Sequence, residues 1–285
     1  MTRRALVLGG GGVAGIAWQT GVLLGLAESG ADVTDAEMLL GTSAGSSVAA
    51  QISSGVPLAE FFDRQADEAK QDDEPHAEAT IDELVTMLAR AAQNSDGSAL
   101  DTRRRIGTAA LAASTITERE RRAIVGRRLP THSWPNRDLR IVTVDAVTGR
   151  HRVLDRGSGV QLVDAVAASC AIPGMWPPVT IGDHRYVDGG IRASENADLA
   201  VGFEKVLVLK VGALDLEDDP FEIERERLLA GGSKVEVIVP DADSAAAIGP
   251  DATDIAVRSA AAVAGRAQGN AIAERIAEFW IQRTP

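Results

Sequence analysis

A serine stands between two glycines in the run Gly41-Thr42-Ser43-Ala44-Gly45. Glycines two residues on either side of a serine permit the sharp, strained turn that presents a nucleophilic hydroxyl, because side chains at Gly41 or Gly45 would collide with neighbouring backbone. The short apolar segment 37–40 before it has the length of a strand, and residues 46–54 after it are small and helix-compatible. A helix there directs free amide groups and its positive dipole end at the serine. The pattern predicts a nucleophile elbow with Ser43 as the nucleophile.

A second glycine-rich run, Gly9-Gly10-Gly11-Gly12-Val13-Ala14-Gly15, follows the apolar segment 5–8 and contains a G-x-G-x-x-G pattern. In a dinucleotide-binding fold this loop lets the backbone approach a pyrophosphate, and an acidic residue about 20 residues further on holds the ribose. Three acidic residues stand near that distance: Asp32, Asp35 and Glu37. They precede the second apolar segment, whereas the ribose-binding carboxylate should follow it. The same amide groups would also fit an oxyanion, and a merely tight turn between strand and helix is the third interpretation.

A serine hydroxyl is a weak nucleophile until a base takes its proton. The chain contains four histidines, His76, His132, His151 and His184. Their neighbours, an acidic stretch, a loop and arginine-flanked turns, are typical of surface histidines. Asp188 stands in the run Tyr186-Val187-Asp188-Gly189-Gly190, between a predicted strand and a glycine turn. We therefore expect a carboxylate base that acts without histidine.

Taken together, the three segments resemble the patatin-like phospholipase family over roughly residues 5–210. That family has a glycine-rich oxyanion loop near its N-terminus, a G-x-S-x-G elbow on the next strand, and a downstream D-G-G or D-G-A motif. The resemblance implies a catalytic dyad of Ser43 and Asp188. It implies an oxyanion hole built from the amides of Gly10, Gly11 and Gly12, with Ala44. The remaining motif glycines are Gly15, Gly41, Gly45, Gly189 and Gly190.

The activity implied by this resemblance is hydrolysis of carboxylic ester bonds in phospholipids or other acyl lipids, through an acyl-serine intermediate and without metal or organic cofactor. The run Asp72-Asp73-Glu74 lacks the alternation of a calcium-binding loop. For a carboxylate to act as base near pH 7, burial beside an apolar acyl pocket should raise its pKa. One departure stands out, since Ala14 occupies a position where the family usually has arginine or lysine. A catalytically weak member used for lipid binding or regulation, and a dinucleotide-binding protein, are the alternatives.

Composition places the chain among globular proteins. Its 285 residues and 45% hydrophobic content are compatible with one domain, residues 1–285. No apolar run reaches the roughly 18 residues of a membrane span, and removing the N-terminus as a signal peptide would delete the glycine loop, so we expect a cytoplasmic protein. The single cysteine, Cys170, excludes internal disulfides, and the net charge of −12 argues against nucleic acid as a partner. An acyl lipid is the expected partner, and transient membrane-surface contact and a homo-oligomer stay open.

The elements that must position these residues alternate between strands and helices. Strands are predicted at 5–8, 139–144, 152–154, 206–209 and 235–239, and helices at 15–28 and 255–280. The order predicts a three-layer α/β/α fold with a mostly parallel central sheet. Residues 57–130, acidic at first and then arginine-rich, are predicted to form an inserted helical cap, with the arginines between 103 and 128 on an exposed helix face. Met175 and Trp176 are candidates for the acyl pocket or for ordinary core packing.

Overall fold

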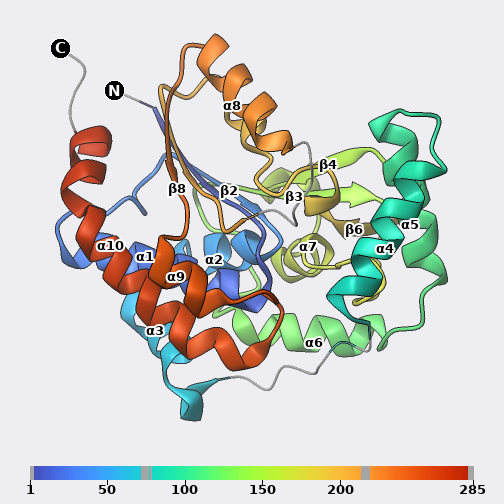
Figure 1. Ribbon diagram of the computed structural model, residues 1–285, viewed down its shortest axis with the longest axis horizontal. Coiled ribbons are helices and arrows are strands. Elements are labelled where there is room, and N and C mark those ends of the chain that lie inside the picture. The colour runs from blue at the N-terminus through green and yellow to red at the C-terminus, as the bar shows by residue number, and fades with distance from the viewer. Residues whose placement is uncertain (1–2, 72–76, 78, 213–218, 282–285) are drawn as a thin grey trace.

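The computed structural model describes residues 3–71, 77, 79–212 and 219–281. Within these residues, eight strands form one sheet in the order β5-β6-β3-β2-β1-β7-β8, with β4 paired to β3 (Figure 1). The strands are β1 (Arg4–Leu8), β2 (Met38–Thr42), β3 (Asp138–Asp145), β4 (His151–Leu154), β5 (Val179–Ile181), β6 (His184–Asp188), β7 (Lys205–Leu209) and β8 (Lys234–Ile238). Strands β3, β2, β1, β7 and β8 are parallel, whereas β4, β5 and β6 join antiparallel at one side. The predicted mostly parallel sheet is confirmed.

Strand chemistry explains this arrangement. The sequences Ala-Leu-Val-Leu in β1 and Val-Leu-Val-Leu in β7 are fully buried and uninterrupted by polar residues. Parallel strands covered on both faces need such continuous apolar runs. Their carboxyl ends meet at one edge of the sheet, and the glycine loop and Ser43 follow β1 and β2 there.

Helices cover both faces of the sheet (Figure 1). They are α1 (Gly12–Glu28), α2 (Ala44–Ile52), α3 (Leu58–Ala66), α4 (Ile81–Gln93), α5 (Ala99–Ala112), α6 (Glu118–Arg128), α7 (Leu162–Ser169), α8 (Pro220–Ala230), α9 (Ala242–Ile248) and α10 (Arg258–Ile281). The main core lies between one face of the sheet and α1, α2, α7 and α10. A second core packs α8 and the short 3₁₀ helix Ala197–Ala200 on the opposite face. The three-layer prediction is therefore confirmed.

Helices α1 and α10 are in close backbone contact. A Cβ atom on Gly21 would lie 2.2 Å from the Ala262 carbonyl oxygen, and one on Gly25 would lie 2.2 Å from the Arg266 carbonyl oxygen. The predicted C-terminal helix thus exists, and much of its buried face packs on α1.

The segment predicted as a cap has two parts. Helix α3 packs on α1 and α10, and therefore belongs to the helical layer on the main core. Helices α4 and α5 pack together beside β4 and β6, and α6 packs on α7 (Figure 1). The run 72–74 and His76, which lie between α3 and α4, are outside the described residues.

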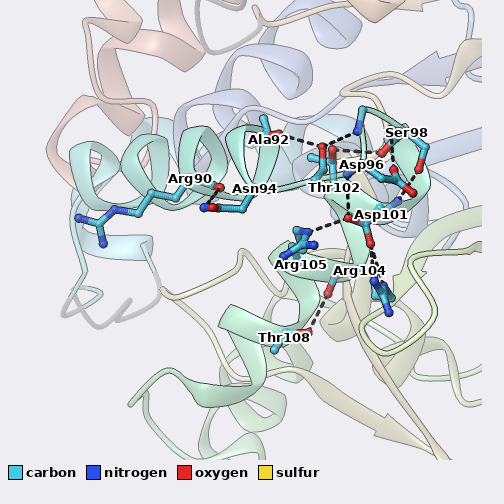
Figure 2. A network of polar contacts seen from close by, with 12 residues as sticks. Arg90, Ala92, Asn94, Asp96, Ser98, Asp101, Thr102, Arg104, Arg105 and Thr108 are labelled. Carbon is cyan, nitrogen blue, oxygen red and sulfur yellow. Dashed lines mark hydrogen bonds and ion pairs between the residues drawn. The ribbon is translucent and has the colours of Figure 1, made fainter.

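A polar network joins α4 to α5 (Figure 2). The Ser98 hydroxyl accepts the Asp101 N–H at 3.1 Å, so Ser98 is the N-cap of α5. The Asp101 carboxylate accepts Arg105 Nε at 2.7 Å and also binds Arg104. Hydrogen bonds from Arg105 and Arg104 lower the pKa of Asp101 to about 2. The Asp101 carboxylate also accepts the Asp96 N–H at 3.2 Å, so the network ties the start of α5 to the loop that follows α4.

Among the described residues, no helix has the length and apolar character needed to cross a membrane.

Candidate active site

Ser43 lies in a strained turn between β2, which ends at Thr42, and α2, which begins at Ala44. Its φ of +52° and ψ of −120° are unfavourable for a residue with a side chain, a conformation that costs about 1–3 kcal/mol. The Ser43 N–H donates to Ser169 Oγ at 2.9 Å, and Ser169 Oγ donates to the Val142 carbonyl oxygen at 2.7 Å. The surroundings thus hold the turn in place and direct the Ser43 side chain away from the strand, as in a nucleophile elbow.

Two glycines of this turn sit where no side chain fits. A Cβ on Gly41 would lie 2.6 Å from Ser46 Cα, and a Cβ on Gly45 would lie 2.0 Å from the Leu8 carbonyl oxygen. The Gly45 N–H donates to the Gly9 carbonyl oxygen at 3.1 Å, which ties the turn to the glycine loop. The steric argument made from the sequence therefore describes the structure.

Asp188 ends β6 and is almost completely buried, with 4% of its surface exposed. Its Oδ1 accepts the Gly190 N–H at 2.7 Å, and its Oδ2 has no hydrogen-bond partner of standard geometry among the described residues. The Ser43 hydroxyl lies close enough to this carboxylate to influence its pKa. Hydrogen bonds of this kind commonly tighten only when substrate is bound. Ser43 and Asp188, separated by 145 positions in the sequence, are thus neighbours in the fold.

Burial raises the pKa of Asp188 to about 7, and the Ser43 hydroxyl, the Gly190 amide and the Arg121 charge oppose that rise. A carboxylate of pKa near 7 takes a proton far more readily than an exposed aspartate. This agrees with the expectation that burial prepares the base.

The glycine loop follows β1 and leads into α1. The Gly10 N–H donates to the Ser194 carbonyl oxygen at 3.0 Å. Of the predicted donors Gly10, Gly11 and Gly12, the amide of Gly10 therefore already has an acceptor within the protein. In the described part of the chain we find no acceptor for the N–H groups of Gly11 and Gly12. The Ala44 N–H, at the start of α2, likewise has no acceptor among the described residues.

A cavity of about 240 Å³ opens beside Ser43. Its walls include Gly12, Ala44, Cys170, Ile172, Met175, Trp176, Arg121 and Arg128. Met175 and Trp176 thus line the pocket, and they also pack with Leu84 in a small hydrophobic cluster, so the structure shows both of the arrangements considered from the sequence. Arg121 is only 3% exposed, and its guanidinium lies 3.8 Å from the centroid of the Trp176 ring. The prediction of an exposed arginine face is therefore wrong for Arg121, which brings positive charge to the pocket beside Ser43.

Comparison with known proteins agrees with this geometry. A family model described as "Patatin-like phospholipase" matches residues 6–201. The chain belongs to the patatin-like phospholipase family. Members of this family are generally serine acyl hydrolases. No curated protein sequence gives a significant match.

Two solved structures are similar to this patatin-like chain. VipD from Legionella pneumophila is 14% identical with a TM-score of 0.49, and the match covers 96% of this chain and 67% of VipD. ExoU, in its heterodimeric complex with SpcU from the type III secretion system of Pseudomonas aeruginosa, is 17% identical with a TM-score of 0.43. That match covers 96% of this chain and 52% of ExoU, so the chain spans about half the length of ExoU.

The three described histidines do not line the patatin-like pocket. His132 Nε2 contacts the Gly126 carbonyl oxygen at 3.0 Å, and His184 Nδ1 contacts Asp145 Oδ2 at 2.7 Å. Burial lowers the pKa of His151, which is near Arg192. None of these three histidines is therefore placed as a base for Ser43, whereas the Asp188 carboxylate lies beside its hydroxyl.

The acidic residues considered for ribose binding lie at the other edge of the sheet. Asp35 and Glu37 form ion pairs with Arg4 at 2.9 Å and 3.3 Å, at the amino end of β1. The glycine loop lies at the carboxyl end of the same strand. Asp35 and Glu37 are therefore not placed to hold a ribose bound at the glycine loop.

Ala14 is fully buried, and its N–H donates to the Ala252 carbonyl oxygen at 3.0 Å. The basic residue that patatin-like loops usually carry here is absent, but Arg121 supplies a cation from α6. Sequence reasoning missed Arg121 and Ser169 as parts of the site. Each contacts a residue more than 25 positions away, so no local pattern marks it.

Proposed function

We propose that the protein is a serine acyl hydrolase that cleaves carboxylic ester bonds of acyl lipids, phospholipids among them. The main observation behind this proposal is that the Ser43 hydroxyl lies beside the buried Asp188 carboxylate. The pKa of that carboxylate is about 7. Family membership supports the reaction class.

In this mechanism Asp188 accepts the hydroxyl proton as Ser43 Oγ attacks the ester carbonyl carbon. The N–H groups of Gly11, Gly12 and Ala44 stabilise the negative charge on the carbonyl oxygen. The intermediate collapses to an acyl-serine, and Asp188 returns the proton to the departing alcohol. Water then attacks the acyl-serine while Asp188 accepts its proton, and the fatty acid leaves as Ser43 regains its hydrogen.

The pocket walls support a lipid substrate. Ile172, Met175 and Trp176 provide apolar surface beside Ser43. The volume of about 240 Å³ is below the roughly 300–1,000 Å³ of typical small-molecule sites. We infer that it holds the ester and the adjoining part of one acyl chain, with the rest of the lipid extending outward.

A fluorophosphonate probe and a short p-nitrophenyl ester test this function. Wild type should be labelled and should hydrolyse the ester, and Ser43→Ala should lose both. Ser54→Ala is the matched control, because Ser54 lies just beyond the far end of α2. Wild type that neither reacts with the probe nor hydrolyses the ester would end the enzyme proposal in favour of lipid binding by the same pocket.

A further inference from the structure

Two described residues other than glycine have a positive φ, namely Ser43 at +52° and Asn196 at +55°. Asn196 is fully buried, and its ψ of 33° places it in the left-handed helical region. Asparagine tolerates that region better than most residues, but a fully buried residue there still needs neighbours that hold it. Its side chain shows which neighbours do so.

The Asn196 amide group donates towards three oxygen atoms. Its Nδ2 lies 2.6 Å from the Ala193 carbonyl oxygen, 3.1 Å from Thr42 Oγ1 and 3.3 Å from the Gly189 carbonyl oxygen. Thr42 directly precedes the nucleophile, and Gly189 directly follows the base. One side chain therefore contacts both turns of the proposed dyad.

The orientation of this amide is fixed from its other end. Asn196 Oδ1 accepts Arg192 Nη1 at 2.6 Å, and Arg192 Nη2 forms an ion pair with Asp198 at 2.6 Å. Both charged side chains are mostly buried. Because the guanidinium is a donor without acceptor capacity, the Asn196 oxygen must face it and the NH₂ group must face the two turns.

The strand order of the sheet explains why the Asn196 side chain is important. The nucleophile follows β2 and the base ends β6, but β3 lies between these strands. No ladder hydrogen bonds therefore join the two strands directly. The Asn196 side chain crosses that gap, with bonds to a residue 154 positions earlier and to one 7 positions earlier.

We propose that Asn196 is a positioning residue that sets the distance between the Ser43 hydroxyl and the Asp188 carboxylate. This inference rests on the proposed hydrolase function. A displacement on the order of 1 Å between reacting groups can lower the rate by about 100-fold. The effect should therefore fall on the chemical step more than on substrate binding.

Two variants test the proposal. Asn196→Asp keeps the shape but cannot donate to Thr42 or Gly189, and Asn196→Gly keeps the backbone conformation without a side chain. Ser233→Ala is the matched control, because it removes a buried hydrogen bond of 2.6 Å to the Phe203 carbonyl oxygen near the amino ends of β7 and β8. Urea denaturation measures the stability that each variant loses.

Both Asn196 variants should lower kcat on a short p-nitrophenyl ester by about 10- to 100-fold, with KM changed less than about 3-fold. Ser233→Ala should retain wild-type kcat despite its loss of stability. Equal kcat losses in Asn196→Gly and Ser233→Ala would overturn the proposal, because the effect would then follow stability alone.

A crystal structure of Asn196→Gly separates this proposal from the hydrolase proposal. We expect a longer distance between Ser43 Oγ and the Asp188 carboxylate than in wild type. An unchanged distance would refute the positioning role whether or not the protein hydrolyses esters, whereas an inactive wild type would refute the hydrolase proposal alone.

Discussion

The N–H of Gly45 donates to the carbonyl oxygen of Gly9 at 3.1 Å, so the turn that carries the proposed nucleophile is bonded directly to the glycine loop that follows β1. This contact requires the two backbones to approach so closely that a Cβ on Gly45 would lie 2.0 Å from the Leu8 carbonyl oxygen. The turn that carries the proposed nucleophile and the glycine loop therefore form one packed unit.

Gly45→Ala should separate that unit. The added methyl group forces the loop and the turn apart, and we expect a loss of about 1–3 kcal/mol in the free energy of unfolding together with loss of ester hydrolysis. Urea denaturation and p-nitrophenyl ester assays measure the two effects. Gly157→Ala is the control, because a Cβ there would meet only Asp155 Oδ1 at 3.4 Å. Normal activity in Gly45→Ala would show that the close contact is not needed.

The pH dependence of hydrolysis should follow Asp188. Because its pKa is about 7, kcat/KM should rise with pH up to about 7 and level off above it, as the carboxylate becomes available as base. A profile that is flat from pH 5 to 8 would contradict the assignment of Asp188 as base.

Arg121 should influence the pH at which kcat/KM rises. Its positive charge lowers the pKa of Asp188, so Arg121→Gln should shift the rise of kcat/KM to higher pH. Arg127→Gln is the matched control, since Arg127 belongs to the same helix but does not line the pocket. The two pH profiles, measured with the same neutral ester, should differ in midpoint. Coinciding midpoints would mean that Arg121 does not act on the base.

Asp188 should also make stability depend on pH. Its folded pKa of about 7 exceeds the ordinary aspartate pKa of 3.8, so the folded state binds more protons between these values and stability falls as pH rises through that window. The cost at pH 8 is at most about 4 kcal/mol. Asp188→Asn should therefore be more stable than wild type at pH 8, and this advantage should shrink at pH 5. Urea midpoints at both values test this, and an equal difference at both would contradict the assigned burial.

Asp101, at the start of α5, should affect stability in the opposite direction to Asp188 as the pH changes. Arg105 and Arg104 hold the pKa of Asp101 near 2, so its stabilising contribution is present above pH 4 and is lost as pH falls towards 2. Asp101→Asn should speed hydrogen exchange of the α5 amides at pH 7, whereas Glu226→Gln on the exposed side of α8 should not. Unchanged exchange in Asp101→Asn would show that the network does not hold this helix.

Local patterns in the sequence predicted much of the fold and the turn that contains Ser43. The turn at Ser43 was predictable because Gly41 and Gly45 answer a steric need within a few residues. The parallel strands were predictable because continuous apolar runs mark strands buried on both faces. Strand β5 was not predicted, because three residues give too short a pattern.

Other features depend on contacts that no local pattern encodes. The Gly10 amide is occupied because Ser194, far along the chain, accepts it. Arg121 is buried because Trp176 packs against its guanidinium, although an arginine-rich helix normally faces solvent. Asn196 matters through a side chain that reaches across β3. Tertiary contacts therefore decide the details that local sequence leaves open.

The central claim is that Ser43 attacks the ester while Asp188 accepts its proton. The rate of fluorophosphonate labelling as a function of pH, with the labelled peptide identified by mass spectrometry, tests it most directly. We predict a label on Ser43 alone, at a rate that rises with a midpoint near pH 7 and that Asp188→Asn lowers by about 100-fold or more. A label on another residue, or a wild-type rate in Asp188→Asn, would contradict the account.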